Sequence, residues 1–312
     1  MNKLQIIAIT AAMALVACDS KNVKPLIGGI RNAEETIEKI NGNGDYASGE
    51  NENNEYSDAQ NSKGKGESGT GRQGKGLEIP ARLTGVSEQI LYRTGYTTSY
   101  NKDTRLPNWV AWCLTAEHTE GTNKRPGKAF HEDTDVPKPR AVDWDYYNSG
   151  YDRGHMCPAA DNKWSADAMY ESFLFTNMCP QNHILNVGDW NEMENQCRRW
   201  AKKYGEVYIV CGPILLKQKH KTIGKNKVVV PEAFFKVVLR MQPSPKAIGF
   251  IYRNTDGNRP KDAYVNSVDE VERITGMDFF PALPDDIENE IECPPHSPQG
   301  GSSNPDKHNY TR

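Results

Sequence analysis

The sequence predicts an α+β fold in which helices flank a central antiparallel sheet. Strand-like segments lie in the first and last parts of the folded region, and helical segments lie between them. This order differs from the regular alternation of strand and helix that builds a parallel sheet. The folded region spans residues 79–293 of the 312-residue chain, which is long enough for one sizeable core.

The early part of this region predicts three strands. Residues 90–93, 96–100 and 109–115 are rich in aromatic and β-branched side chains, which favour the pleated, half-buried surface of a sheet. Asn101-Lys102-Asp103 predicts the turn between the second and third strands. Residues 117–150 contain several Pro and Asp and predict a long irregular section.

The remainder predicts helices and then more strands. Apolar side chains recur at helical spacing over residues 166–173 and 187–204, and Gly205 predicts the end of the second helix. The later elements are a buried strand over 207–215, a basic hairpin over 217–227, strands over 233–241 and 247–252, and a helix over 268–275 that stops at Gly276.

The N-terminus predicts export and a lipid anchor. Lys3 precedes a mostly apolar stretch over residues 4–16, which is too short to span a bilayer comfortably and fits a secretory signal. It ends in Leu15-Val16-Ala17-Cys18, which resembles a bacterial lipobox. We therefore expect residues 1–17 to be a lipoprotein signal peptide and Cys18 to be lipidated, holding the mature chain at the periplasmic face or the cell surface. The alternative is a signal peptide cut nearby, with an incidental cysteine.

Two polar segments flank the folded region. Residues 18–78 are rich in Gly, Asn, Ser and Glu and contain few large apolar side chains. Such a segment cannot bury enough surface to offset its ordering entropy, so we expect a flexible tether. Residues 294–312 are rich in Pro, Ser, Asn and Gly and predict a disordered tail.

The cysteines carry a second expectation from export. Apart from Cys18, the chain has six, at positions 113, 157, 179, 197, 211 and 293. An oxidising compartment favours at least one disulfide, but six cysteines allow about 15 full pairings and the sequence does not choose among them. Their spacing lacks the close pairs of a zinc site.

The net charge excludes one function class. A formal charge of −3 shows that the chain as a whole is not a basic nucleic-acid binder, so phosphate contacts would come from a local cluster. The lysines of the predicted hairpin form such a cluster, at positions 217, 219, 221, 225 and 227. Two interpretations stay open: they steer a polyanion, or they form an ordinary solvated hairpin.

The first motif with chemical potential is Asp152-Arg153-Gly154-His155. Glycine permits a bend, which would aim the arginine and the histidine at one place. Histidine is well suited to accept a proton near neutral pH. The alternative interpretation is a surface turn with a local ion pair.

A second motif lies in the predicted helix that follows. Asn186, Trp190, Glu194 and Arg198 are each four residues apart and stay roughly on one side of a helix. A neighbouring stripe predicts the core face, and its members are Met193, Cys197, Trp200 and Tyr204. The polar flank would therefore point to one site. Alternatively, Glu194 and Arg198 form a surface pair and Asn186 caps the helix.

The two motifs together resemble the DNA/RNA non-specific endonuclease family of the ββα-metal, or His-Me finger, superfamily. The resemblance rests on Asp152-Arg153-Gly154-His155, Asn177, Gln181, Asn186, Trp190, Glu194 and Arg198, which occur in order. Trp109-Val110-Ala111, Gly212-Pro213 and Phe279-Phe280-Pro281 extend it over most of the folded region. It implies a ββα-metal active-site motif.

The resemblance also implies roles for these residues. His155 would be the general base, and Asn186 the single direct protein ligand of a divalent metal. That metal would be Mg²⁺, which keeps most of its waters, with Mn²⁺ or another divalent ion able to substitute. Glu194 would orient the waters of the metal, and Arg153 and Arg198 would stabilise the transition state.

Three further residues receive positioning or binding roles. Asn177 and Gln181 would position backbone or substrate near His155, with Arg153 and Gln181 contacting the substrate. Arg105 is a further, weaker match to a phosphate-contacting arginine, because the spacing of its loop varies. Asp152 would be structural or would support the ligands from behind.

The expected function is Mg²⁺-dependent endonucleolytic hydrolysis of DNA and RNA with little sequence preference, leaving 5′ phosphates. Contacts to phosphate and sugar would explain the lack of preference. Two alternatives stay open. One is a phosphodiesterase of the same superfamily that acts on a small substrate. The other is a non-catalytic surface lipoprotein that only binds nucleic acid.

Overall fold

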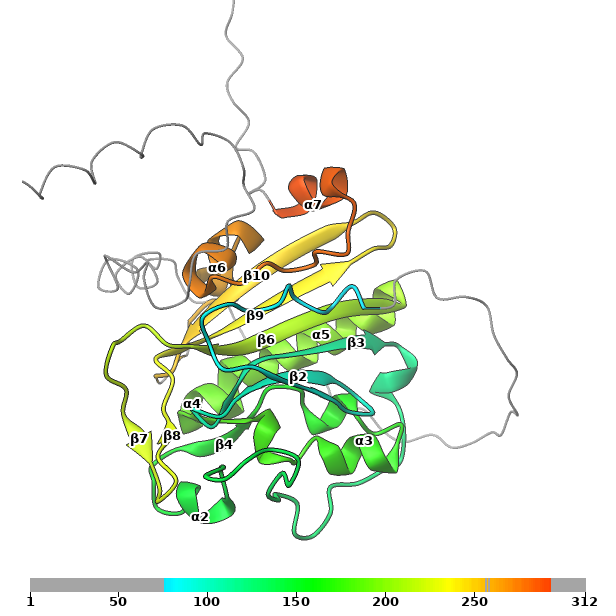
Figure 1. Ribbon diagram of the computed structural model, residues 1–312. Helices are drawn as coiled ribbons and strands as arrows, with labels where there is room; N and C mark the ends of the chain where they lie inside the picture. Colours follow the sequence, from blue (N-terminus) through cyan, green and yellow to red (C-terminus); the bar gives the residue numbers. More distant parts are fainter. Residues whose placement is uncertain (1–75, 256, 258, 293–312) are drawn as a thin grey trace, which may run out of the picture.

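The computed structural model describes residues 76–292 apart from 256 and 258. The predicted signal peptide, Cys18, most of the tether, Cys293 and the tail lie outside these residues. The described part is built on a seven-stranded sheet with the order β1-β2-β3-β6-β9-β10-β11 (Figure 1). All neighbouring strands in it are antiparallel, which confirms the predicted fold class.

The strands of this sheet lie close to the predicted segments. They are β1 (Gln89–Tyr92), β2 (Thr97–Asn101), β3 (Leu106–Thr115), β6 (Glu206–Ile214), β9 (Ala233–Arg240), β10 (Lys246–Arg253) and β11 (Val265–Asn266). The central strands β3, β6 and β9 are almost entirely buried. They are covered on both faces, which explains their nearly continuous apolar sequences.

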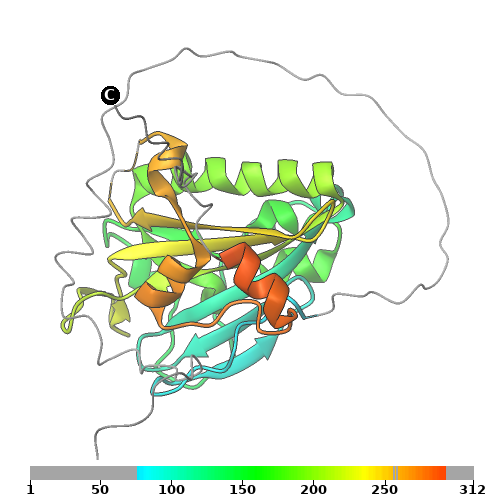
Figure 2. The same cartoon turned by 90° about the horizontal axis from the view of Figure 1, so that it is seen from above.

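Helices cover the two faces of the sheet (Figure 2). On one face, α5 (Asn191–Tyr204) contributes Met193, Cys197 and Ala201 to a core with Trp112 and Ile209. On the other, α6 (Val268–Thr275) and α7 (Asp285–Glu292) cover a second apolar cluster. Gly205 and Gly276 end α5 and α6, as predicted, and the structure gives both a positive φ. The sequence did not predict α7, because acidic side chains dominate it.

The predicted helix over 187–204 begins earlier than expected. The side chain of Asn182 caps α4 (His183–Leu185) by accepting from the backbone N–H groups of Ile184 and Leu185. A π-helical turn, η4 (Asn186–Trp190), joins α4 to α5, and Gly188 departs from helical geometry there (φ −97°, ψ −111°). This irregular turn places Asn186 one turn before the first residue of α5.

A small antiparallel pair supplies the other half of the motif. β4 (Asp152–His155) pairs with β5 (Met178–Gln181), so that Asp152 is opposite Gln181 and His155 is opposite Met178. With the helix that follows, these two strands form the ββα arrangement that the resemblance implied. A second pair, β7 (Thr222–Ile223) and β8 (Val228–Val229), forms the predicted basic hairpin.

The remaining helices are short. They are η1 (Glu117–Thr119), α2 (Asp143–Tyr146), η2 (Ala159–Asp161), α3 (Ala166–Glu171), η3 (Phe175–Asn177) and η5 (Lys261–Tyr264). Within residues 76–292, no helix combines the length and the apolar character needed to cross a bilayer.

The cysteines of the described region differ from expectation. No disulfide joins any two of the five that the structure describes. Cys157, Cys179, Cys197 and Cys211 are instead buried in the core on the α5 face. Burial raises the pKa of Cys197 to about 12 and that of Cys211 to about 11, so both behave as small apolar side chains.

Candidate active site

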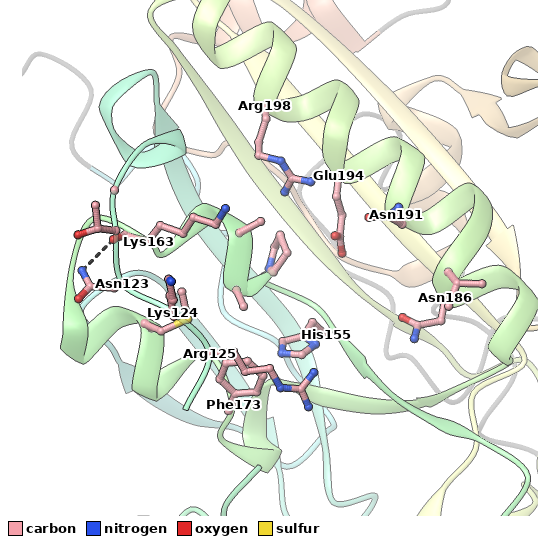
Figure 3. A pocket seen from close by; sticks show the side chains of 17 residues that line it. Asn123, Lys124, Arg125, His155, Lys163, Phe173, Asn186, Asn191, Glu194 and Arg198 are labelled. Carbon is pink, nitrogen blue, oxygen red and sulfur yellow. Dashed lines mark hydrogen bonds between the residues drawn. The ribbon is translucent and has the colours of Figure 1, made fainter. Parts of the chain in front are cut away.

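A cleft of about 810 Å³ opens between the end of β4, the loop at 121–125 and the start of α5. Four of the predicted residues line it: His155, Asn186, Glu194 and Arg198. Figure 3 shows the last three along one flank of the helical segment, with His155 facing them from its strand. The four-residue spacing thus predicted their common location correctly.

The lining of the cleft is strongly cationic. It contains Lys124, Arg125, Lys163 and Arg198, whereas Glu194 is the one carboxylate among the described residues that line it. Positive charge concentrated in a concave site raises the local concentration of a polyanion. The net charge of −3 for the chain therefore conceals a local field of the opposite sign.

His155 is held as a neutral base in the lining of the cleft. Its ring packs edge-on against Phe173 at 4.9 Å between centroids and lies 5.8 Å from Phe130. Burial chiefly, and the charge of Arg125 in addition, lower its pKa to about 3. Its Nε2 has no hydrogen-bond partner within the part of the chain that the structure describes. A neutral imidazole with a free nitrogen can accept a proton from a group that enters the cleft.

Asn186 is oriented by a carboxylate behind it. Its Nδ2 donates to Asp152 Oδ2 at 2.9 Å, and His183 Nδ1 lies 2.8 Å from the same oxygen. Within residues 76–292, the Oδ1 of Asn186 accepts no hydrogen bond. By holding Nδ2, Asp152 orients the amide so that Oδ1 of Asn186 points away from Asp152 and into the cleft (Figure 3). This agrees with the supporting role predicted for Asp152.

The donor set here fits a hard divalent ion. The free oxygen of Asn186 and the carboxylate of Glu194 both line the cleft, and oxygen ligands suit Mg²⁺. The described residues contain no group of three or more His, Cys, Asp or Glu side chains that could hold a metal by themselves. A metal at this site would therefore keep most of its waters.

Glu194 lies above a buried charge network. Burial raises its pKa to about 7, opposed by the charge of Lys236. Arg198 Nη1 donates to the buried Asp161 at 2.7 Å, and Trp112 Nε1 donates to the other oxygen of that carboxylate at 3.2 Å. This network fixes the guanidinium of Arg198 at the wall of the cleft.

Lys236 was not predicted from the sequence. Its side chain is fully buried on β9, and its Nζ lies 4.3 Å from the ring centroid of Trp190 and 5.2 Å from that of Trp112. The charges of Glu194 and Asp161 both favour its ammonium form. The signal was present in the sequence: one lysine interrupts the apolar segment 233–239, and a buried lysine needs compensating charge.

Arg125 was also not predicted, because it lies in the section predicted to be irregular. Its guanidinium stacks over Phe130 at 4.9 Å and Phe173 at 5.2 Å from the ring centroids. These are the two rings that pack against His155. The aromatic pair thus places a cation next to the base.

Trp190 connects the two halves of the site. It is fully buried, and its Nε1 donates to the backbone carbonyl of His155 at 3.1 Å. This bond fixes the strand that carries the base against the helix that carries Asn186 and Glu194.

Four other predicted residues do not line the cleft. Arg153 Nε donates to Asp143 at 2.7 Å, and Arg105 Nη1 donates to the carbonyl of Asp103 at 2.7 Å in the β2–β3 turn. Asn177 is fully buried and bonds the backbone N–H of Cys157 at 2.9 Å and its C=O at 2.8 Å. The fourth is Gln181, which is also fully buried.

Gly154 differs from its predicted role as a bend. It lies within the regular pairing of β4 and β5, opposite Cys179. A methyl carbon added at Gly154 would lie 2.3 Å from Oε1 of Gln181. Glycine is therefore required because the Gln181 side chain crosses directly over it, and that close approach packs the strand behind His155.

Comparison with known proteins adds independent findings. Residues 73–286 match the family described as DNA/RNA non-specific endonuclease. The mitochondrial nuclease EXOG of Xenopus laevis is 36% identical over 206 residues, which cover 60% of this chain and 57% of that protein. Mitochondrial endonuclease G of Bos taurus is 34% identical over 216 residues, covering 64% of this chain and 72% of that protein.

A solved structure is similar as well. The crystal structure of an EndoG/EndoGI complex, which concerns the inhibition of EndoG, superimposes with a TM-score of 0.61 at 28% identity, and the match covers 70% of this chain and 94% of that one. The chain spans less than two thirds of the length of the EXOG nucleases, with 57% covered in Xenopus laevis and 61% in Danio rerio.

Proposed function

This chain belongs to the DNA/RNA non-specific endonuclease family, and we propose that it hydrolyses phosphodiester bonds in DNA and RNA with the help of a divalent metal. The observation that carries the proposal is the pairing of two free atoms in one cationic cleft. These are Nε2 of a neutral His155 and the carbonyl oxygen of Asn186.

His155 acts as the general base. Its pKa of about 3 keeps it neutral before a substrate binds. A phosphate group that enters brings negative charge, which stabilises the imidazolium and raises the pKa towards the working pH. The imidazole then takes a proton from the attacking water at Nε2. Trp190 holds the backbone of this residue in place during the transfer.

Asn186 would hold the metal through its carbonyl oxygen, and Glu194, which lines the same cleft, would accept hydrogen bonds from waters on that metal. When bound, a divalent ion such as Mg²⁺ supplies neutralisation of the charge that develops on the phosphate. Asp152 holds the Asn186 amide so that its oxygen remains available. Mn²⁺ is expected to substitute, because it also accepts oxygen ligands.

Arg198 and Arg125 stabilise the additional negative charge of the transition state. Both guanidinium groups line the cleft and are fixed before the substrate arrives, one by Asp161 and the other by aromatic rings. Preorganised charge of this kind costs little reorganisation during the reaction. Arg153 is neutralised by Asp143 and does not line the cleft, so we assign it no contact with the substrate.

Asn177 and Gln181 act by positioning. Asn177 holds the backbone of Cys157, two residues after the base. Gln181 packs over Gly154, directly before it. Neither needs to touch the substrate to influence the location of His155.

Digestion assays test this function. Plasmid DNA and a structured RNA are incubated with the protein in Mg²⁺, in Mn²⁺ and in EDTA, beside His155→Ala. We expect both nucleic acids to be cut with either metal and no cutting in EDTA or by the variant. Full activity in EDTA or in His155→Ala would overturn the mechanism. Cleavage of a chromogenic diester with both polymers intact would instead favour the small-substrate phosphodiesterase.

We also propose that Cys18 carries a lipid and anchors the exported enzyme to a membrane. The support is the lipobox-like sequence Leu15-Val16-Ala17-Cys18 and the polar stretch that follows it. Mass spectrometry of the mature chain is expected to find an acylated Cys18 at its N-terminus. A mature chain that begins elsewhere, with an unmodified thiol, would contradict the anchor.

A further inference from the structure

A second cavity, of about 270 Å³, lies at the basic hairpin. Its lining includes Lys217, Lys219, Lys221, Tyr151 and Glu232, and we call it the lysine pocket. Figure 1 shows the β7–β8 hairpin next to α2 and β4, on the side of the domain that carries the catalytic motif. Tyr151 directly precedes Asp152, the residue that orients Asn186.

Among the described residues that line this pocket, the lysines outnumber the carboxylates. None of the three lysines forms an ion pair with a carboxylate in the part of the chain that the structure describes. Glu232 accepts from the backbone N–H of Leu216 at 3.0 Å and lies 3.1 Å from Nδ1 of His220, and its single negative charge is outnumbered by the three lysines. The pocket therefore holds three lysines that have no carboxylate partner among the described residues.

Lys221 is the best-placed of these ammonium groups. Its Nζ donates to the Tyr151 hydroxyl at 3.3 Å and lies 4.7 Å from the centroid of the same ring. Its backbone carbonyl accepts from Val230 at 2.8 Å, which fixes the start of the hairpin. A lysine tethered in this way loses less conformational entropy when it binds an anion than a freely rotating one.

The wall of the pocket is fastened to the catalytic motif. Asn254 accepts from the backbone N–H of Asn182 at 2.7 Å and donates to the carbonyls of Pro180 and Pro231 at 3.0 and 2.9 Å. Asn182 caps the helix that leads to Asn186. A ligand in the lysine pocket would thus be held in a fixed relation to the cleft.

We propose that the lysine pocket binds a backbone phosphate of the polynucleotide, at a nucleotide distant from the bond that is cleaved. This proposal rests on the proposed function, and it names a second contact for the same substrate. The volume is slightly below the range of roughly 300–1,000 Å³ typical of ligand pockets, which suits a single phosphate rather than a base pair. Recognition would be independent of sequence, since phosphates carry no base information.

The test compares two lysines of the same hairpin. Lys221→Glu reverses a charge inside the pocket, whereas Lys225→Glu reverses an exposed charge that does not line it. Binding of a fluorescent single-stranded 30-mer is measured by anisotropy in EDTA, where cleavage is not expected. We expect Kd to rise about 5- to 10-fold for Lys221→Glu, with a salt slope smaller by about 0.7, and less than about twofold for Lys225→Glu.

A milder variant and a cleavage assay complete the design. Lys221→Gln removes the charge without reversing it and should give an intermediate Kd. With metal present, Lys221→Glu should raise KM for the 30-mer but leave kcat/KM for a dinucleotide unchanged, since the proposal assigns the lysine pocket to a phosphate beyond the two nucleotides at the cleft. Equal Kd values for Lys221→Glu and Lys225→Glu would overturn the pocket, whether or not the protein cleaves. Normal 30-mer binding together with loss of binding to phosphatidylglycerol vesicles would overturn it in favour of a membrane contact. If the protein cleaves nothing but its Kd still rises for Lys221→Glu and not for Lys225→Glu, the proposed function would be refuted and the lysine pocket would stand.

Discussion

Lys236 and Val237 are neighbours in β9, yet their side chains enter opposite faces of the sheet with opposite properties. Val237 joins an apolar cluster beneath α6, whereas Lys236 lies under α5 among Asp161, Glu194 and Trp190. Burying charge is costly unless it is compensated. The α6 face of the sheet therefore contributes mainly to stability. The α5 face is less stable than an apolar face would be, because it holds the charged residues of the site.

The largest expected effect tests whether the α5 face carries the chemistry. Asn186→Ala removes the amide oxygen that we assign to the metal, so kcat should fall about 100- to 1,000-fold and the half-saturating Mg²⁺ concentration should rise. Val187→Ala is the matched control, because Val187 lines the same cleft and is half exposed. Steady-state cleavage over a Mg²⁺ titration measures both. Equal loss in the two variants would mean that Asn186 acts only through packing.

Lys236→Met should give the next largest effect. The Lys236 charge holds down the pKa of Glu194, which burial nevertheless raises to about 7. Without the ammonium, the pKa of Glu194 rises further. If the ionised carboxylate is the active form, activity at pH 7 should fall about tenfold for each unit by which this pKa rises. A pH profile separates this from simple misfolding. The variant should regain activity at pH 9, and a uniform loss across all pH values would refute the electrostatic role.

The pH dependence of stability tests the cost of the site. Glu194 has a folded pKa of about 7, above its ordinary value of 4.5. A raised pKa means that the folded state binds the extra proton. Its contribution to stability is therefore fully present below pH 4.5 and is lost as the pH rises through about 7. Glu194→Gln should remove this loss. Between pH 4.5 and about 7, the free energy of unfolding of the variant should therefore rise relative to that of the native sequence. Urea unfolding at pH 4.5, 6 and 8 measures the difference, and parallel curves would contradict it.

The smallest effect on activity should come from the opposite face. Val237→Ala leaves a small cavity in the apolar cluster and should cost about 1–3 kcal/mol of unfolding free energy. The kcat at 25 °C should stay within about twofold, because that cluster shares no residue with the lining of the cleft. A large fall in kcat with little change in melting temperature would show that the two faces are coupled, and the division between them would fail.

Much of the fold could be predicted because its strands have strong local signals. Aromatic and β-branched runs marked β1 to β3, and nearly continuous apolar runs marked β6 and β9. The prediction that the helix starts near residue 187 was wrong, since the true start depends on the Asn182 cap and the irregular turn at Gly188. The cap and the turn depend on backbone geometry, which the periodicity of the side chains does not reveal.

The site was predicted where spacing alone could group residues. Asn186, Glu194 and Arg198 share a helical flank, so their convergence followed from periodicity. Arg125 could not be placed, because an irregular loop carries no periodic signal. Lys236 comes from a strand far along the chain, and only the folded sheet brings it beneath Glu194. Long-range packing of this kind leaves one trace in sequence, a charged residue within an apolar run.

The position of Trp190 has a spectroscopic consequence. Its indole donates to the carbonyl of His155 on one side and lies 4.3 Å from the ammonium of Lys236 on the other. An adjacent fixed charge shifts the emission wavelength of an indole. Trp190, together with Trp112 at 5.2 Å from the same ammonium, should therefore report the charge state beneath the cleft by its emission, which should move when Lys236 is replaced or when an anion occupies the site.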